Sequence, residues 1–168
     1  MSSSDRRSFL SAFAGLGLAA SMLSACGFTP AYGPQGGASA IQGTIAVQAP
    51  KNRNGYLLVR RLEERLGRAT GPYRLDYQYG LEEQDFGTTS AGFTTRYRLV
   101  GTVTYELKDA TDRLITRGTV EEFVGYSATG STVSTPAARA DAQERLATIL
   151  ADRIVEEMIF AADLLPAS

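Results

Sequence analysis

The chain has 168 residues and a mass of 18.0 kDa, the size of one ordinary domain. Hydrophobic residues make up 43% and charged residues 21%, which is typical of a globular chain and not of a disordered one. Lysine and arginine total 17 and aspartate and glutamate 18, so we expect no nucleic-acid partner, which would favour a basic chain. With no histidine and one cysteine, a Ser-His-Asp triad, a thiolate zinc site and an internal disulfide are excluded. We therefore expect neither a metal nor a cofactor.

The first 25 residues have the pattern of an export signal. Arg6 and Arg7 precede an uncharged run of apolar and small residues, 9–23. A bilayer-spanning helix needs about 20 apolar residues, so this shorter run disfavours a transmembrane anchor. The segment 6–10, Arg-Arg-Ser-Phe-Leu, resembles a twin-arginine signal, and a general secretory signal is the equally open alternative.

The apolar run ends in Leu23-Ser24-Ala25-Cys26, which resembles a bacterial lipobox. We therefore expect residues 1–25 to be removed as a lipoprotein signal peptide and Cys26 to carry acyl chains. Each buried methylene of such a chain contributes ~0.8 kcal/mol, so several chains give a durable membrane anchor. Residue 27 is glycine and not the aspartate that retains many lipoproteins in the inner membrane, which favours the outer membrane.

Residues 26–39 are expected to form the lipidated cysteine and a flexible tether rich in Gly, Pro and Ser, followed by a single domain over 40–165. The alternation of Ile41, Ile45 and Val47 predicts a first strand over 41–47. After a polar break at 50–54, leucines recur every four residues up to Gly67 and predict a helix whose charged residues cover a solvated face.

The rest of the domain is predicted to be a meander of three strands followed by a helix. Period-two alternation predicts strands over 73–81, 97–107 and 114–126, with a loop at 82–92 and a turn at 109–112. The tyrosines of the first of these strands are expected to pack under the helices, and imperfect alternation in the last indicates a bulge or burial on both faces. A final helix is predicted from Thr135, with Pro136 in its first turn, to about residue 162.

This order, strand-helix-strand-strand-strand-helix, predicts an α+β fold. The strand-helix-strand unit favours a right-handed crossover and a parallel pair, and the later strands join by hairpins. We expect one small four-stranded mixed sheet, largely antiparallel, with two helices packed on it.

The domain carries no recognisable catalytic motif, since it contains neither a Gly-rich phosphate loop nor a Gly-x-Ser-x-Gly elbow. Arg96 and Arg98 share one face of a predicted strand and Arg139 begins the last helix, while further basic residues border the following hairpin: Lys108, Arg113 and Arg117. Arginine and lysine suit phosphate groups, and dispersed solubilising charge is the alternative interpretation.

The segment 26–33, Cys-Gly-Phe-Thr-Pro-Ala-Tyr-Gly, resembles the mature start of the alphaproteobacterial LptE family, and the order of elements matches that family over essentially the whole mature chain. The resemblance implies two helices on a four-stranded sheet and no enzymatic activity. It implies a plug inside the LptD outer-membrane barrel, which assists assembly of that barrel and takes part in lipopolysaccharide insertion. The resemblance also implies that Arg139 contacts lipopolysaccharide. We predict Arg96 and Arg98 as further contacts because of their positive charge.

Two further functions remain open at the level of sequence. One is a periplasm-facing lipoprotein accessory subunit of a lipid transporter, which would have a similar size, anchor and fold. The other is a lipid-anchored hydrolase, for which the sequence offers no motif. The expected location is the periplasmic side of the outer membrane.

Overall fold

A computed structural model describes residues 33, 36–88, 94–128 and 134–164, so the predicted signal peptide, Cys26 and most of the predicted tether lie outside the described residues. The elements in chain order are α2 (Gly37–Ile41), β1 (Ile45–Val47), α3 (Arg53–Leu66), β2 (Tyr73–Thr88), β3 (Thr94–Lys108), β4 (Leu114–Ser127), α4 (Ser134–Phe160) and the 3-10 helix η2 (Ala161–Leu164). None of the helices in these ranges is long and apolar enough to cross a bilayer.

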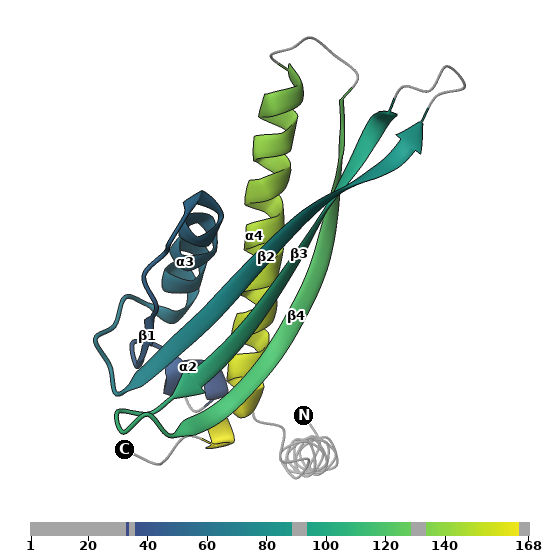
Figure 1. Cartoon of the computed structure of the whole chain (residues 1–168). Helices are drawn as coiled ribbons and strands as arrows, with labels where there is room; N and C mark the ends of the chain where they lie inside the picture. Colours follow the sequence, from purple (N-terminus) through teal and green to yellow (C-terminus); the bar gives the residue numbers. More distant parts are fainter. Residues whose placement is uncertain (1–32, 34–35, 89–93, 129–133, 165–168) are drawn as a thin grey trace, which may run out of the picture.

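The four strands form one sheet in the order β1-β2-β3-β4. β1 runs parallel to β2, and both later pairs are antiparallel. This confirms the α+β fold and the mixed sheet predicted from the strand-helix-strand unit and the two hairpins. β2, β3 and β4 are long and strongly curved, and α3 and α4 lie on one side of them (Figure 1).

The core lies between the sheet and the two long helices. Each helix contributes a stripe of buried side chains at helical spacing, and the strands contribute every second residue. Gly101 of β3 allows close packing, since a Cβ there would lie 2.7 Å from Leu150 Cδ1 of α4. The largest fully buried side chains are Ile45, Leu58, Leu62, Leu66, Leu75, Leu99, Leu107, Leu146, Leu150, Ile154, Met158 and Val103.

Local sequence explains where α3 begins and ends. The Asn52 side chain accepts a hydrogen bond from Gly55 N at 2.8 Å and caps the first turn. At the other end Gly67 has φ +81°, a backbone conformation that glycine adopts without strain, so the predicted stop is confirmed.

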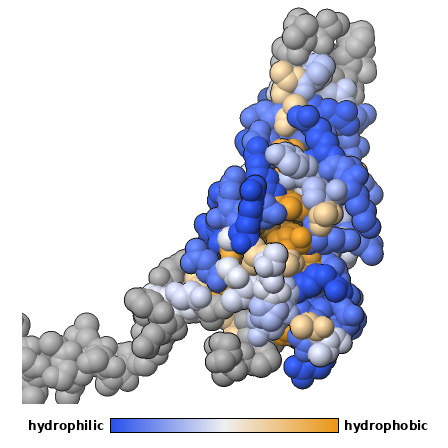
Figure 2. Space-filling view, turned by 90° about the vertical axis from the view of Figure 1, so that its left-hand side faces the viewer, coloured by the Kyte–Doolittle hydropathy of each residue, from blue (hydrophilic) through white to orange (hydrophobic). Residues whose placement is uncertain are grey.

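Charged side chains link α3 to α4 over the core. Arg61 binds Asp152 through two bonds, Nε to Oδ1 at 3.0 Å and Nη2 to Oδ2 at 2.9 Å. Arg60 Nη2 lies 2.6 Å from Glu144 Oε1. From the side of α3 the surface is mostly hydrophilic, with one small group of hydrophobic atoms near its middle (Figure 2).

Two predicted boundaries differ from the structure near the start of the domain and at the first hairpin. Ile41 ends helix α2, so the first strand is limited to Ile45–Val47, and residues 37–39 of the predicted tether belong to α2. The predicted loop at 82–92 is wrong over 82–88, where β2 continues to Thr88. The side chains of this segment are mostly polar, but its backbone still pairs with β3, so the strand continues.

The irregularity predicted for the last strand is present. The β3–β4 pairing shifts register between Leu107 and Lys108, close to the hairpin turn. Val120 and Val124 face the core, whereas Phe123 lies on the opposite face and is 61% exposed. At Phe123 the pairing is regular and the side chain is exposed, so neither a bulge nor burial on both faces explains the break in alternation there.

Candidate functional site

The sheet has one face covered by helices and one open face. Alternation along the strands turns every second side chain of β2, β3 and β4 away from α3 and α4. We define the open face by these residues: Arg74, Asp76, Gln78, Glu82, Gln84, Phe86, Arg96, Arg98, Val100, Thr102, Thr104, Glu106, Lys108, Arg117, Thr119, Glu121 and Phe123. It combines both signs of charge with a small aromatic region, and it is where the sequence placed Arg96 and Arg98.

Arg98 lies between two phenylalanines on the open face. Its guanidinium carbon is 5.6 Å from the centroid of Phe86 and 5.3 Å from that of Phe123, within cation–π range of both rings. Arg98 Nη2 donates a 2.7 Å hydrogen bond to Gln84 Oε1, and its buried Nε has no hydrogen-bond partner. Both rings are more than 60% exposed, so the arrangement presents an aromatic and cationic surface to solvent.

Arg96 lies on the same face, two residues closer to the connection between β2 and β3. Its backbone pairs with Ser127 on β4 and with Gly87 on β2. The side chain is exposed, and within the described ranges no carboxylate forms an ion pair with it. The regular pairing of β3 with β4 confirms the prediction that Arg96 and Arg98 share one face.

Arg139 is not brought together with these two arginines. It lies in α4, on the helix-covered side, and its Nε is 2.6 Å from Glu83 Oε2 of β2. Tyr126 approaches the same carboxylate: burial first, and then Glu83, raise the pKa of the Tyr126 hydroxyl. The three predicted residues thus lie in two separate places. At the open place Arg96 has no ion pair within the described ranges, and at the other the charge of Arg139 is matched by Glu83.

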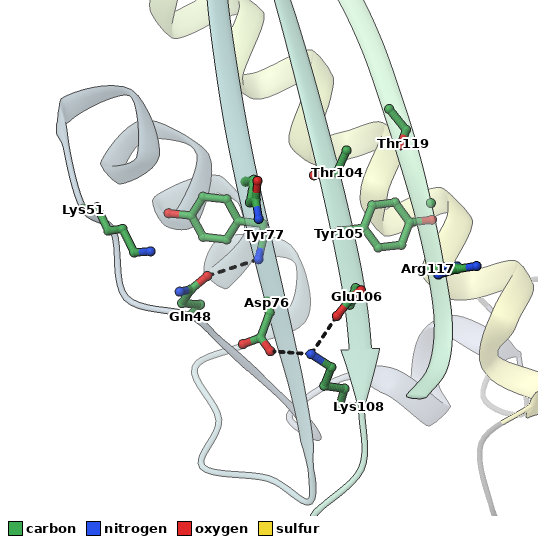
Figure 3. A pocket seen from close by; sticks show the side chains of 12 residues that line it. Gln48, Lys51, Asp76, Tyr77, Thr104, Tyr105, Glu106, Lys108, Arg117 and Thr119 are labelled. Carbon is green, nitrogen blue, oxygen red and sulfur yellow. Dashed lines mark hydrogen bonds and ion pairs between the residues drawn. The ribbon is translucent and has the colours of Figure 1, made fainter. Parts of the chain in front are cut away.

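A polar hollow of about 690 Å³ occupies the other end of the open face (Figure 3). Lys108 Nζ lies there between two carboxylates, 3.2 Å from Asp76 Oδ2 and 2.6 Å from Glu106 Oε2. The bonds to Glu106 and then Asp76 raise the pKa of Lys108. Burial alone would raise the pKa of Asp76, but bonds from Arg74 and Lys108 outweigh it, so that pKa lies below its usual value.

Lys108 and Arg117, which the sequence placed beside the last hairpin, both line this hollow, and two polar residues from another part of the chain join them. Gln48 and Lys51 follow β1, and Gln48 Oε1 accepts a 3.1 Å hydrogen bond from Tyr77 N, which extends the pairing beyond the short strand. Sequence offered no signal for this contact, because the two residues are 29 positions apart. The described residues contain no group of acidic or cysteine side chains that could hold a metal ion.

The tyrosine row of β2 faces the helices, as predicted. Tyr73, Tyr77 and Tyr79 are partly buried and pack against the core. Burial raises the pKa of Tyr79 to about 12 and, to a smaller extent, that of Tyr77. These rings therefore pack under the helix layer, and Tyr77 also lines the polar hollow.

Solved structures share this architecture. A protein described as a lipoprotein from Caulobacter crescentus CB15 matches with a TM-score of 0.62 and 26% identity, covering 78% of this chain and 98% of its own. A minor lipoprotein from Acinetobacter baumannii matches with a TM-score of 0.57 and 18% identity, covering 76% and 99%. The rare lipoprotein B from Shewanella oneidensis matches with a TM-score of 0.52 and 15% identity, covering 68% and 91%.

Comparison by sequence gives the family. No curated protein matches the chain at a significant level. The family described as "LptE: Lipopolysaccharide-assembly" matches residues 42–158, which is more than half of the chain and runs from the end of α2 to the last turn of α4. The resemblance in residues 26–33 and the order of elements agree with this match, and the chain belongs to the LptE family of lipopolysaccharide-assembly lipoproteins.

Proposed function

We propose that this lipoprotein works with an LptD-like outer-membrane β-barrel, assists assembly and plugging of that barrel, and takes part in lipopolysaccharide insertion without catalysing a reaction. The observation that carries the proposal is the family match over residues 42–158. The lipobox ending in Cys26 supports anchoring by acyl chains at the periplasmic side of the outer membrane.

Lipopolysaccharide carries phosphates beside acyl chains, and the Arg98 region of the open face offers complementary groups. Among the described residues Arg96 has no ion pair, and the Arg98 guanidinium donates a hydrogen bond to an amide oxygen and to no carboxylate. Phe86 and Phe123 provide apolar surface beside these charges. Arg139 would have to exchange its 2.6 Å bond to Glu83 for a phosphate, so we place it below the other two as a contact.

Binding to purified lipopolysaccharide tests these residues. We expect the double variant Arg96→Glu/Arg98→Glu to bind at least about tenfold more weakly, since one lost charge-assisted hydrogen bond costs about 1.5 kcal/mol or more. Arg113→Glu/Arg117→Glu is the matched control, because it also reverses the charge of two arginines but does so at the far end of β4. Equal loss in both variants, or no loss in the Arg96→Glu/Arg98→Glu variant, would contradict the assignment.

Recovery of the partner tests the rest of the proposal. The acylated chain, purified from membranes in mild detergent, is expected to bring a large outer-membrane barrel with it. Recovery of an inner-membrane transporter instead would favour the accessory-subunit function. Cys26→Ala is expected to prevent acylation, and a variant that still floats with membranes after signal cleavage would contradict the anchor.

A further inference from the structure

One end of the molecule gathers the start of the domain and the end of the last helix. In Figure 1, α2, the last turn of α4, η2 and the β3–β4 turn lie together at this end. α2 packs closely on α4, since a Cβ on Gly37 would lie 2.6 Å from Ile159 O and 3.1 Å from Ala162 Cβ. We call this the α2 end.

The α2 end is also the part of the domain nearest to the proposed lipid anchor. Gly33 is seven residues beyond Cys26, and a fully extended chain gives at most about 3.6 Å per residue, so Gly33 stays within about 25 Å of the anchored cysteine. Gly33 O in turn accepts hydrogen bonds from Gly36 N at 2.9 Å and from Ser39 Oγ at 2.9 Å, which fix it to the start of α2. An acylated Cys26 therefore keeps the α2 end close to the bilayer surface.

Two large hydrophobic side chains are exposed at this end. Phe160, the last residue of α4, is 83% exposed, and Leu114, the first residue of β4, is 44% exposed. An isolated exposed apolar side chain is ordinary. Here both lie at the end held near lipid. Asp163 is the only charged residue in the segment 158–166, whereas Leu114 follows the charged residues Asp112 and Arg113 of the turn.

We infer that the α2 end rests on the bilayer and that Phe160 and Leu114 enter its interfacial region, an inference that depends on the proposed acylation of Cys26. Phenylalanine and leucine are favoured at the boundary of headgroups and acyl chains. Arg96 pairs with Gly87 next to Phe86 and lies 12 residues before Lys108 on β3, so at about 3.3 Å per residue Phe86 is at most about 40 Å away along the sheet.

The chain contains no tryptophan, so a single introduced indole reports its own surroundings. We would place it at Phe160→Trp and, as the matched control, at Phe86→Trp, which is 64% exposed at the opposite end of the sheet. Both acylated variants are reconstituted into phosphatidylethanolamine and phosphatidylglycerol vesicles with or without brominated acyl chains. We expect a blue-shifted emission and loss of most intensity to bromine at position 160, and neither at position 86.

Flotation and bromine quenching test the acyl anchor and the membrane contact separately. Flotation of the vesicles reports the anchor, and a chain that does not float overturns the anchor together with the membrane contact. A chain that floats but is quenched equally at positions 86 and 160 overturns the contact alone. A blue shift at position 160 without bromine quenching would show that protein covers this residue, such as a second copy of the chain, and would also overturn it.

Discussion

The two faces of the sheet are formed by the same three strands but differ in what their side chains do. On the helix-covered face Leu75, Leu99 and Val103 are fully buried under α3 and α4. On the open face the side chains interact with one another and with solvent, through ion pairs, threonine hydroxyls and the Phe86–Arg98–Phe123 cluster. Because burial differs so much, substitutions on the helix-covered face should change stability, and those on the open face should change binding.

The largest effect is expected for Leu150→Ala in α4. Leu150 is fully buried and packs over Gly101, so truncation leaves a cavity that the rigid sheet cannot close. We expect a loss of about 2–5 kcal/mol in the free energy of unfolding, measured by urea denaturation. Thr104→Ala on the open face is the control and should stay within about 0.5 kcal/mol. Similar losses in the two variants would mean that the helix layer is not the main source of stability.

Two neighbouring residues of β4 allow the helix-covered face and the open face to be compared within one strand. Val124 is 7% exposed on the helix-covered face, and Phe123 points the other way. Val124→Ala is expected to cost about 1–3 kcal/mol, because two buried methyl groups are lost and a cavity remains. Phe123→Ala removes more atoms but only an exposed cation–π contact with Arg98, so it should cost about 0.5–1 kcal/mol. The reverse order, in thermal or urea unfolding, would contradict the assignment of faces.

These faces could be predicted from sequence where alternation was regular, and only there. The alternation around Leu99 and Val103 predicted a buried row and placed Arg96 and Arg98 opposite it, because burial on one face fixes the register of a strand. Phe86 was assigned to a loop and Phe123 was an irregularity, since an exposed aromatic residue on an open face follows no burial pattern. The periodicity of the sequence therefore could not predict the cluster around Arg98.

Long-range pairing was equally inaccessible from sequence. Arg139 and Glu83 lie 56 positions apart, and their ion pair depends on how α4 approaches the end of the sheet. A basic residue at the start of a helix looks free in sequence, while in the fold its charge is already matched. Charge alone therefore grouped Arg139 with Arg96 and Arg98, and only the fold separates them.

Tyr79 allows the helix-covered face to be tested by pH. Burial raises its pKa to about 12, from about 10 in an unfolded chain, so the unfolded state loses this proton first as pH rises. The stability that this group contributes is complete below about pH 10 and is lost as pH approaches 12. After discounting for partial exposure, Tyr79→Phe should gain about 1 kcal/mol relative to the wild type between about pH 9 and pH 11.5. Tyr56→Phe, at an exposed position of α3, is the control, and equal pH profiles for the two variants would contradict the burial of Tyr79.

The smallest effect concerns ion pairs on the two sides of the molecule. Arg61 binds Asp152 through two parallel bonds across α3 and α4, and both side chains are about one-third exposed. On the open-face side Arg74 and Asp112 form a 2.7 Å pair whose carboxylate is mostly exposed. Double-mutant cycles to alanine should give a coupling of about 0.5–1 kcal/mol for the first pair and at most about 0.3 kcal/mol for the second, because solvent screens the exposed pair and the two-bond geometry is fixed by helix packing. Added salt should reduce both couplings and leave their order unchanged, whereas equal couplings at low salt would show that the interhelical ion pairs contribute no more than the surface pairs of the open face.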